Sequence, residues 1–189
     1  MRYTEIGRRT QDRKKERIMD QKVYELINDQ INKELYSGYL YLTFADYYEA
    51  QGLKGFANWY VIQAQEERDH ALIFRRYLLD NDCPVKMLAI AQPDKEFTDL
   101  IGPLEAALEH EKYVTSLIND IYAAAEEAKD YRTLQFLKWF IDEQLEEEAN
   151  ASEMVSNMKL FGGDPRGLYA LDREYLTRVY NVPSPLAAE

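Results

Sequence analysis

Apolar residues recur along most of this chain at steps of three, four and seven positions, the spacing that lines one face of an α-helix. The first stripe, for example, contains Ile27, Tyr41 and Tyr48. No segment alternates apolar and polar residues over any length, so strands are not predicted. The pattern predicts four long helices, at about 20–50, about 54–79, from 98–103 to about 129, and about 131–160.

The segments between these helices contain turn-forming and helix-breaking residues and differ in length. Gly52 marks a short turn between the first and the second, whereas Pro84 and Pro93 punctuate a long link before the third. Two helical hairpins joined by a long link predict an all-α four-helix bundle. The link then crosses the length of the bundle, so that the third helix runs parallel to the second. A short fifth helix is expected at about 168–180, before Pro183.

Composition limits the class of protein. A hydrophobic content of 46% in 189 residues suits one domain with a sizeable core and excludes disorder. No apolar run approaches the ~20 residues of a membrane span, and we expect neither a secretory signal nor a membrane partner. The single cysteine, Cys83, forms no internal disulfide and is expected to be an inert loop thiol, which favours a cytoplasmic location.

The charge is large and unevenly distributed. A net charge of −11 favours cations as partners and makes nucleic-acid binding an unexpected function. Residues 1–18, however, hold seven basic side chains against three acidic ones. We therefore divide the chain into a basic N-terminal extension at 1–18 and one folded domain at 19–189. The extension is interpreted as a partner-binding arm, a solvated helix or residues upstream of a true start at Met19.

Four glutamates interrupt the apolar stripes, one in each predicted long helix. They are Glu34, Glu67, Glu111 and Glu147, and Glu67 is followed three residues later by His70. Burying an uncompensated ion costs several kcal/mol, so four of them would rival the ~5–15 kcal/mol that stabilises a typical domain. The pattern therefore predicts a cationic partner among them, and a pair of metal ions fits best.

The donor types indicate which metal this is. One Glu from each of two helices and a Glu-x-x-His motif match the ligand scheme of carboxylate-bridged di-iron bundles. Residues three apart lie one turn apart on the same face, so Glu67 can bridge two ions while His70 binds one of them terminally. Hard oxygen donors with a single imidazole suit Fe(II) better than a closed zinc site.

Two side chains near these ligands extend the candidate site. Tyr41, seven residues after Glu34, is interpreted as a hydrogen-bond partner of a ligand, an electron donor or an ordinary core tyrosine. Gln144, one turn before Glu147, is placed to orient a ligand or bound oxygen.

The remaining polar candidates have weaker patterns. Three glutamates beside the ligands face another side and either hold a third cation or belong to a solvated acidic run: Glu66, Glu143 and Glu146. His110 points about 100° away from Glu111 on a helix, and is expected at the surface. Trp59 and Trp139 are interpreted as packing residues.

Several stretches in this order resemble the bacterial non-haem ferritins over most of the chain. They are INKELYSGYLYL (31–42), AQEERDH (64–70), the glutamate of EHEKYV (109–114), FLKWFIDEQLEEE (136–148) and GLYALDREYL (167–176). The resemblance implies a ferritin-like domain at 19–189 and a hollow shell of 24 subunits, with the fifth helix lining the four-fold axes. It implies oxidation of Fe(II) by dioxygen or peroxide and storage of a ferric mineral.

The resemblance also implies roles for individual residues. Glu34, Glu67 and His70 would surround one iron of a ferroxidase centre. A second iron would be held by Glu67, Glu111 and Glu147, with Gln144 and Tyr41 close by. A third iron site would consist of Glu66, Glu143 and Glu146.

The sequence lacks motifs that two related families, the bacterioferritins and the rubrerythrins, would have. A bacterioferritin would have a second Glu-x-x-His motif, but Asn150 follows Glu147, and Arg68 stands where its haem-ligand methionine would be. We therefore predict no haem. One cysteine cannot supply the paired CxxC motifs of a rubrerythrin. Three alternative functions remain: a storage shell with little ferroxidase activity, a di-iron redox enzyme acting on an organic substrate, and a DNA binder with a basic arm.

Overall fold

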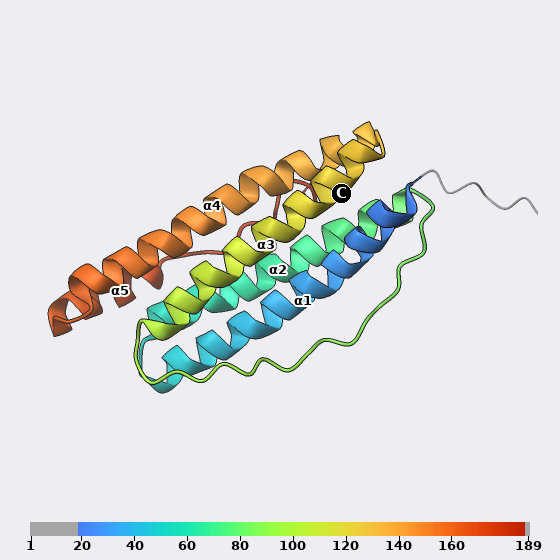
Figure 1. The fold of residues 1–189 in the computed structure, drawn as a ribbon. Helices are drawn as coiled ribbons and strands as arrows, with labels where there is room; N and C mark the ends of the chain where they lie inside the picture. The colour runs from blue at the N-terminus through green and yellow to red at the C-terminus, as the bar shows by residue number, and fades with distance from the viewer. Residues whose placement is uncertain (1–18, 188–189) are drawn as a thin grey trace, which may run out of the picture.

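The computed structural model describes residues 19–187, and it has the predicted all-α architecture (Figure 1). The basic extension at 1–18 lies outside the described residues. Four long helices lie side by side and a short fifth helix crosses one end of the bundle. The helices are α1 (Gln21–Ala50), α2 (Lys54–Asp80), α3 (Gly102–Glu127), α4 (Tyr131–Phe161) and α5 (Pro165–Tyr175). None of these helices is long and apolar enough to span a membrane.

Local sequence accounts for the helix ends. The Asp20 carboxylate accepts hydrogen bonds from the backbone N–H groups of Lys22 and Val23 at the start of α1. Gly52 has a φ of +79°, which favours glycine in the turn before α2. The fifth helix is displaced from its predicted position at 168–180. It begins earlier because Asp164 caps it and Pro165 suits its first turn, and it ends at Tyr175.

The long connection at 81–101 runs along the outside of α1, from the end of α2 back to the start of α3 (Figure 1). It has no helix or strand of its own, and side chains of α1 hold its backbone at intervals. Asn28 both donates to and accepts from the backbone of Lys86, at 3.0 and 2.8 Å. Near the other end, the Tyr48 hydroxyl donates to the carbonyl of Leu100 at 2.6 Å. The connection therefore crosses the bundle as predicted and makes α3 parallel to α2.

The apolar core is divided into two clusters. The α5-end cluster includes Leu40, Phe44, Tyr48, Phe56, Leu104, Met154 and Tyr175. The far-end cluster includes Val23, Ile27, Phe74, Ile118, Leu137, Phe140 and Cys83, whose thiol is buried. On every long helix the candidate ligands fall between the two clusters in sequence. A buried polar layer therefore crosses the middle of the bundle.

Candidate metal centre

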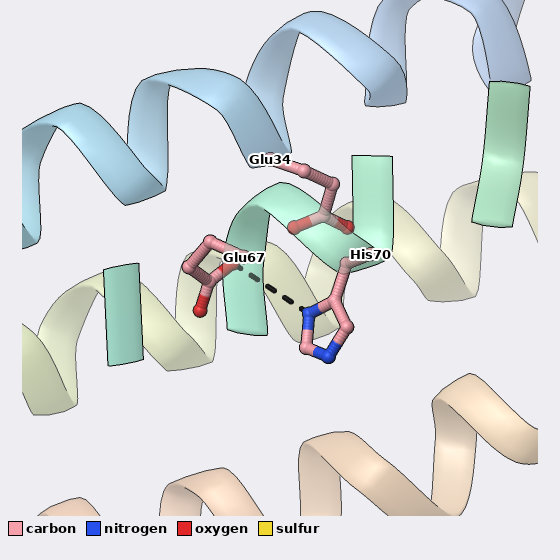
Figure 2. A group of neighbouring side chains, drawn as sticks. All are labelled: Glu34, Glu67 and His70. Carbon is pink, nitrogen blue, oxygen red and sulfur yellow. Dashed lines mark ion pairs between the residues drawn. The ribbon is translucent and has the colours of Figure 1, made fainter. Parts of the chain in front are cut away.

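The structure brings the four glutamates and the histidine together in this polar layer. Three overlapping groups have ligand atoms within 4.8 Å of one another: Glu34, Glu67 and His70; Glu67, Glu111 and Glu147; and His70, Glu143 and Glu147. Figure 2 shows the first group, with Glu34 on α1 facing Glu67 and His70 on α2. Glu67 is the residue common to the two fully buried groups, which is the position that a bridging carboxylate requires.

A glycine on α1 allows α1 and α2 to approach each other at this level. A Cβ atom on Gly38 would lie 3.0 Å from the carbonyl oxygen of Ala64 and 3.5 Å from the Cβ of Glu67. The first distance is tighter than most Cβ contacts and the second is an ordinary van der Waals contact, so a side chain here would press on the backbone of α2. Gly38 therefore helps to set the distance between Glu34 and Glu67.

Neutral side chains hold several of the carboxylates by hydrogen bonds. Gln30 donates to Glu34 at 2.9 Å, one turn along α1. Gln63 donates to Glu147 at 2.7 Å and to Glu67 at 3.3 Å. Each amide donor places a partial positive charge against one carboxylate oxygen. The other oxygens of these carboxylates have no such donor and face one another.

Glu111 has its own two donors. The Tyr41 hydroxyl donates to one of its carboxylate oxygens, and the Gln144 amide donates to the other at 3.3 Å. Burial and the neighbouring carboxylates Glu111 and Glu67 raise the pKa of Tyr41 well above its ordinary value. Tyr41 therefore stays protonated and acts as a hydrogen-bond donor.

Three ligand atoms are buried without any hydrogen-bond partner: one carboxylate oxygen each of Glu34 and Glu147, and Nε2 of His70. Orphaned polar atoms of this kind are rare in folded proteins and mark a missing partner. The pKa values of Glu34, Glu67 and Glu147 are raised well above the ordinary value, first by burial and also by neighbouring carboxylates. The carboxylates repel one another when they are charged, and a multivalent cation between them would remove this repulsion. Oxygen donors with one imidazole suit iron, so the residues present fit this metal.

The proposed third-site glutamates are less well assembled. Glu143 joins a candidate group with His70 and Glu147. Glu66 instead forms an ion pair with Arg178, and Glu146 is exposed to solvent. The third site therefore stays a prediction.

His110 does not lie at the surface as predicted. It is partly buried, shares a hydrogen bond of 2.8 Å with Ser37, and its ring packs edge-on against that of Tyr41 at 5.9 Å. Burial lowers its pKa to about 4. The rotation of 100° from Glu111 was correct, but the neighbouring helix α1 covers that side of α3. Trp59 and Trp139 pack against aromatic neighbours, as predicted.

Sequence reasoning missed three residues that contact the ligands or their neighbours. Gln30 and Gln63 each stand four residues before a ligand glutamate, a spacing that brings helical side chains together. That repeated Gln-x-x-x-Glu pattern was the available signal. Arg178 follows the fifth helix, and nothing in the sequence pattern connects it with Glu66 on α2.

The fold and site define a four-helix bundle whose interior is lined by carboxylates and a histidine that could together hold metal ions. The model of the ferritin-like domain matches residues 24–161. The bacterial non-heme ferritin of Campylobacter jejuni is 36% identical over 156 residues, which cover 82% of this chain and 93% of that protein. That of Staphylococcus aureus is 31% identical over 87% of this chain and 99% of its own.

Solved structures agree. An open-pore ferritin from the archaeon Archaeoglobus fulgidus matches with a TM-score of 0.83 and 40% identity, over 85% of this chain and 98% of that one. A closed form of that ferritin, engineered by mutagenesis, matches with a TM-score of 0.84 and 39% identity, over 86% of this chain and 99% of that one. The chain belongs to the ferritin family.

Proposed function

We propose that this protein stores iron and oxidises Fe(II) at the buried carboxylate centre, with dioxygen or peroxide as the oxidant. One observation carries the proposal: the unpartnered atoms of Glu34, His70 and Glu147 lie buried within a set of carboxylates that share Glu67. A structural role would have satisfied these atoms with protein donors.

Each ligand has a proposed role. One Fe(II) is held by Glu34, Glu67 and His70, and the other by Glu67, Glu111 and Glu147. Glu67 bridges the two, whereas Tyr41 and Gln144 keep the Glu111 carboxylate in place.

The proposed reaction transfers two electrons from the two Fe(II) ions to the oxidant. Two Fe(II) ions lose one electron each, and the pair reduces dioxygen to hydrogen peroxide with two protons, or hydrogen peroxide to water. Anionic carboxylates stabilise the Fe(III) product more strongly than the Fe(II) substrate because the attraction grows with the charge of the ion. The net charge of −11 attracts the incoming cation.

We also propose the finer properties that follow from membership of the family. The subunits assemble as a hollow shell of 24, with α5 at the four-fold axes, in the cytoplasm. A third iron site is formed by Glu66, Glu143 and Glu146. No haem is bound, and the test is the absence of a Soret band in freshly purified protein.

The size of the cavity beside the centre disfavours an enzyme for organic substrates. Tyr41, Trp59, Tyr60, Glu111 and Glu147 are among the residues that line it, and its volume is about 20 Å³. A space of that size admits a single water molecule. Dioxygen and metal ions fit such a site better than a hydroxylase substrate does.

The deciding experiment is aerobic Fe(II) oxidation, followed by stopped-flow absorbance at two irons per subunit. Glu67→Ala is compared with the wild type and with Glu126→Ala, which removes an exposed carboxylate of α3. We expect fast oxidation in the wild type and the control, and near-background oxidation in Glu67→Ala. Equal rates in all three would contradict a ferroxidase centre and favour a shell that only stores iron.

A further inference from the structure

The C-terminal tail, residues 176–187, does not leave the molecule after α5. It turns back and runs along the bundle beside α2 (Figure 1). The Tyr180 hydroxyl donates to the carboxylate of Asp69 on α2, and Leu186 packs against the far-end cluster. The tail is therefore held at both ends of its path, and Arg178 lies near its start.

The Arg178 guanidinium contacts three side chains of α2. It donates to Glu66 at 2.5 Å and to the side-chain oxygen of Gln63 at 3.1 Å, and it lies over the Trp59 ring, 4.1 Å from the ring centre. The Arg178 and Glu66 side chains are only 18% and 17% exposed. An ion pair this sheltered is screened less by salt than a surface pair.

Arg178 also fixes the orientation of an amide at the metal centre. A guanidinium only donates hydrogen bonds, so the Gln63 oxygen must face Arg178. The amide nitrogen of Gln63 then faces the opposite way and donates to Glu147 and Glu67. A continuous row of hydrogen bonds thus joins the tail to the carboxylates.

We propose that Arg178 is a built-in counter-ion that occupies Glu66 in place of the third metal ion, so that an ion binding there must first displace the tail arginine. This inference rests on the proposed third site. In the structure Glu66 is paired with Arg178 and belongs to none of the candidate metal groups.

The structure also provides a second place for the displaced arginine. A cavity of about 280 Å³ lies next to Arg178, between α4, α5 and the tail, and Trp59, Glu153 and Glu174 line it. Its two glutamates can receive the guanidinium without exposing the charge to an apolar surface. Arg178 therefore has two carboxylate environments, and a metal ion favours the one away from Glu66.

The test is calorimetric titration of Zn²⁺, which does not change oxidation state, into the metal-free assembled protein. Arg178→Gln is compared with the wild type and with Arg173→Gln, which removes the same charge from an exposed position on α5. We expect the third equivalent to bind about tenfold more tightly in Arg178→Gln alone. An unchanged or weaker third equivalent would overturn the proposal.

A double-mutant cycle checks that the effect passes through Glu66. In a Glu66→Gln background, Arg178→Gln should give no gain in Zn²⁺ affinity; the same gain would show that Arg178 acts elsewhere. Loss of the first two equivalents in the wild type would instead contradict the proposed di-iron centre, and the tail proposal with it.

A second measurement keeps Arg178 intact. Trp139→Phe leaves Trp59 as the only tryptophan of the chain. Displacement of the guanidinium from the Trp59 ring should change the fluorescence at the third equivalent of Zn²⁺ and not at the first two. A spectrum that stays constant through the third equivalent would contradict displacement.

Discussion

Gln63 on α2 donates a hydrogen bond of 2.7 Å to Glu147 on α4, and so joins two helices across the polar layer. The same amide reaches Glu67, the carboxylate shared by two ligand groups. One neutral side chain therefore supports a ligand from each side of the site. Groups that orient metal ligands in this way commonly affect metal affinity almost as much as the ligands do.

Replacing Gln63 by Leu should weaken metal binding without removing a ligand. The variant leaves one Glu147 oxygen without its donor, so this carboxylate is free to rotate away from the second metal position. We expect the affinity for the second equivalent of Zn²⁺ to fall by roughly 10- to 100-fold. Calorimetric titration measures this, and Gln135→Leu, at an exposed position of α4, is the control. Equal affinities in the two variants would contradict the role of Gln63.

The stability of the metal-free protein should depend on pH in an unusual direction. The pKa values of Glu34, Glu67 and Glu147 are raised in the folded state, so folding favours their protonated forms. This contribution is fully present below the ordinary carboxyl pKa and is lost as the pH rises through the higher folded values. We expect the free energy of unfolding, measured by urea denaturation, to fall as the pH rises above the ordinary carboxyl pKa.

Two comparisons isolate these carboxylates from the rest of the acidic chain. A variant with Glu34→Gln and Glu147→Gln should show a shallower fall with pH, because two of the titrating groups are gone. Zn²⁺ should raise the melting temperature more at high pH than at low pH, since the metal competes with protons. Stability that rises steadily with pH in the metal-free wild type would refute the prediction.

Phe74→Ala should destabilise the end of the bundle beyond His70. Phe74 is fully buried, and its ring is stacked on that of Phe140 with the centres 4.0 Å apart. Removing a buried phenylalanine side chain costs about 3–5 kcal/mol, because apolar contacts are lost and a cavity remains. Leu145→Ala, which truncates a side chain that is 73% exposed, should change the free energy of unfolding by about 0.5 kcal/mol or less. Similar losses in both would show that Phe74 is not part of a tightly packed core.

Gly55→Ala should detach α5 from the bundle. The Asp172 carboxylate on α5 accepts hydrogen bonds from the backbone N–H groups of Gly55 and Phe56, at 2.6 and 3.2 Å, and so caps the start of α2. A Cβ atom on Gly55 would lie 1.6 Å from the Asp172 carbonyl oxygen. We expect faster tryptic cleavage within α5 and impaired assembly, measured by limited proteolysis and light scattering.

The matched control for that substitution is Gly163→Ala, because a Cβ atom there meets no atom within 4 Å. It should leave proteolysis and assembly as they are in the wild type. Slow cleavage in both variants would mean that α5 does not need its close contact with α2.

The sequence predicted the crossover from the long, proline-containing link between the two helical hairpins. It predicted the four long helices and the positions of the five candidate ligands because these depend on local spacing along each helix. Glu67 and His70, for example, follow directly from a separation of three residues. The start of α5 differs from the prediction because Asp164 caps the helix and Pro165 suits its first turn, and both residues lie outside the apolar pattern. The burial of His110 was missed because it depends on how α1 covers α3, which no single-helix pattern records.

The contact between Arg178 and Glu66 could not be predicted from the sequence pattern, for a reason different from that for His110. It joins residues 112 positions apart through a tail without regular structure, so neither periodicity nor capping predicts it. Gln63, by contrast, was within reach, since it stands one helical turn before Glu67.

The division of the core into the α5-end and far-end clusters makes the subunit resemble two short bundles stacked end to end, with the carboxylate layer as the joint. This joint has polar side chains in place of apolar packing, and its carboxylates repel one another when they are charged. Amide hydrogen exchange in the metal-free protein should therefore be faster in the helical turns that carry Glu34 and Glu67 than in the turns within the two clusters. A joint of this kind would let ions pass in and out of the middle of the subunit while both ends keep their packing.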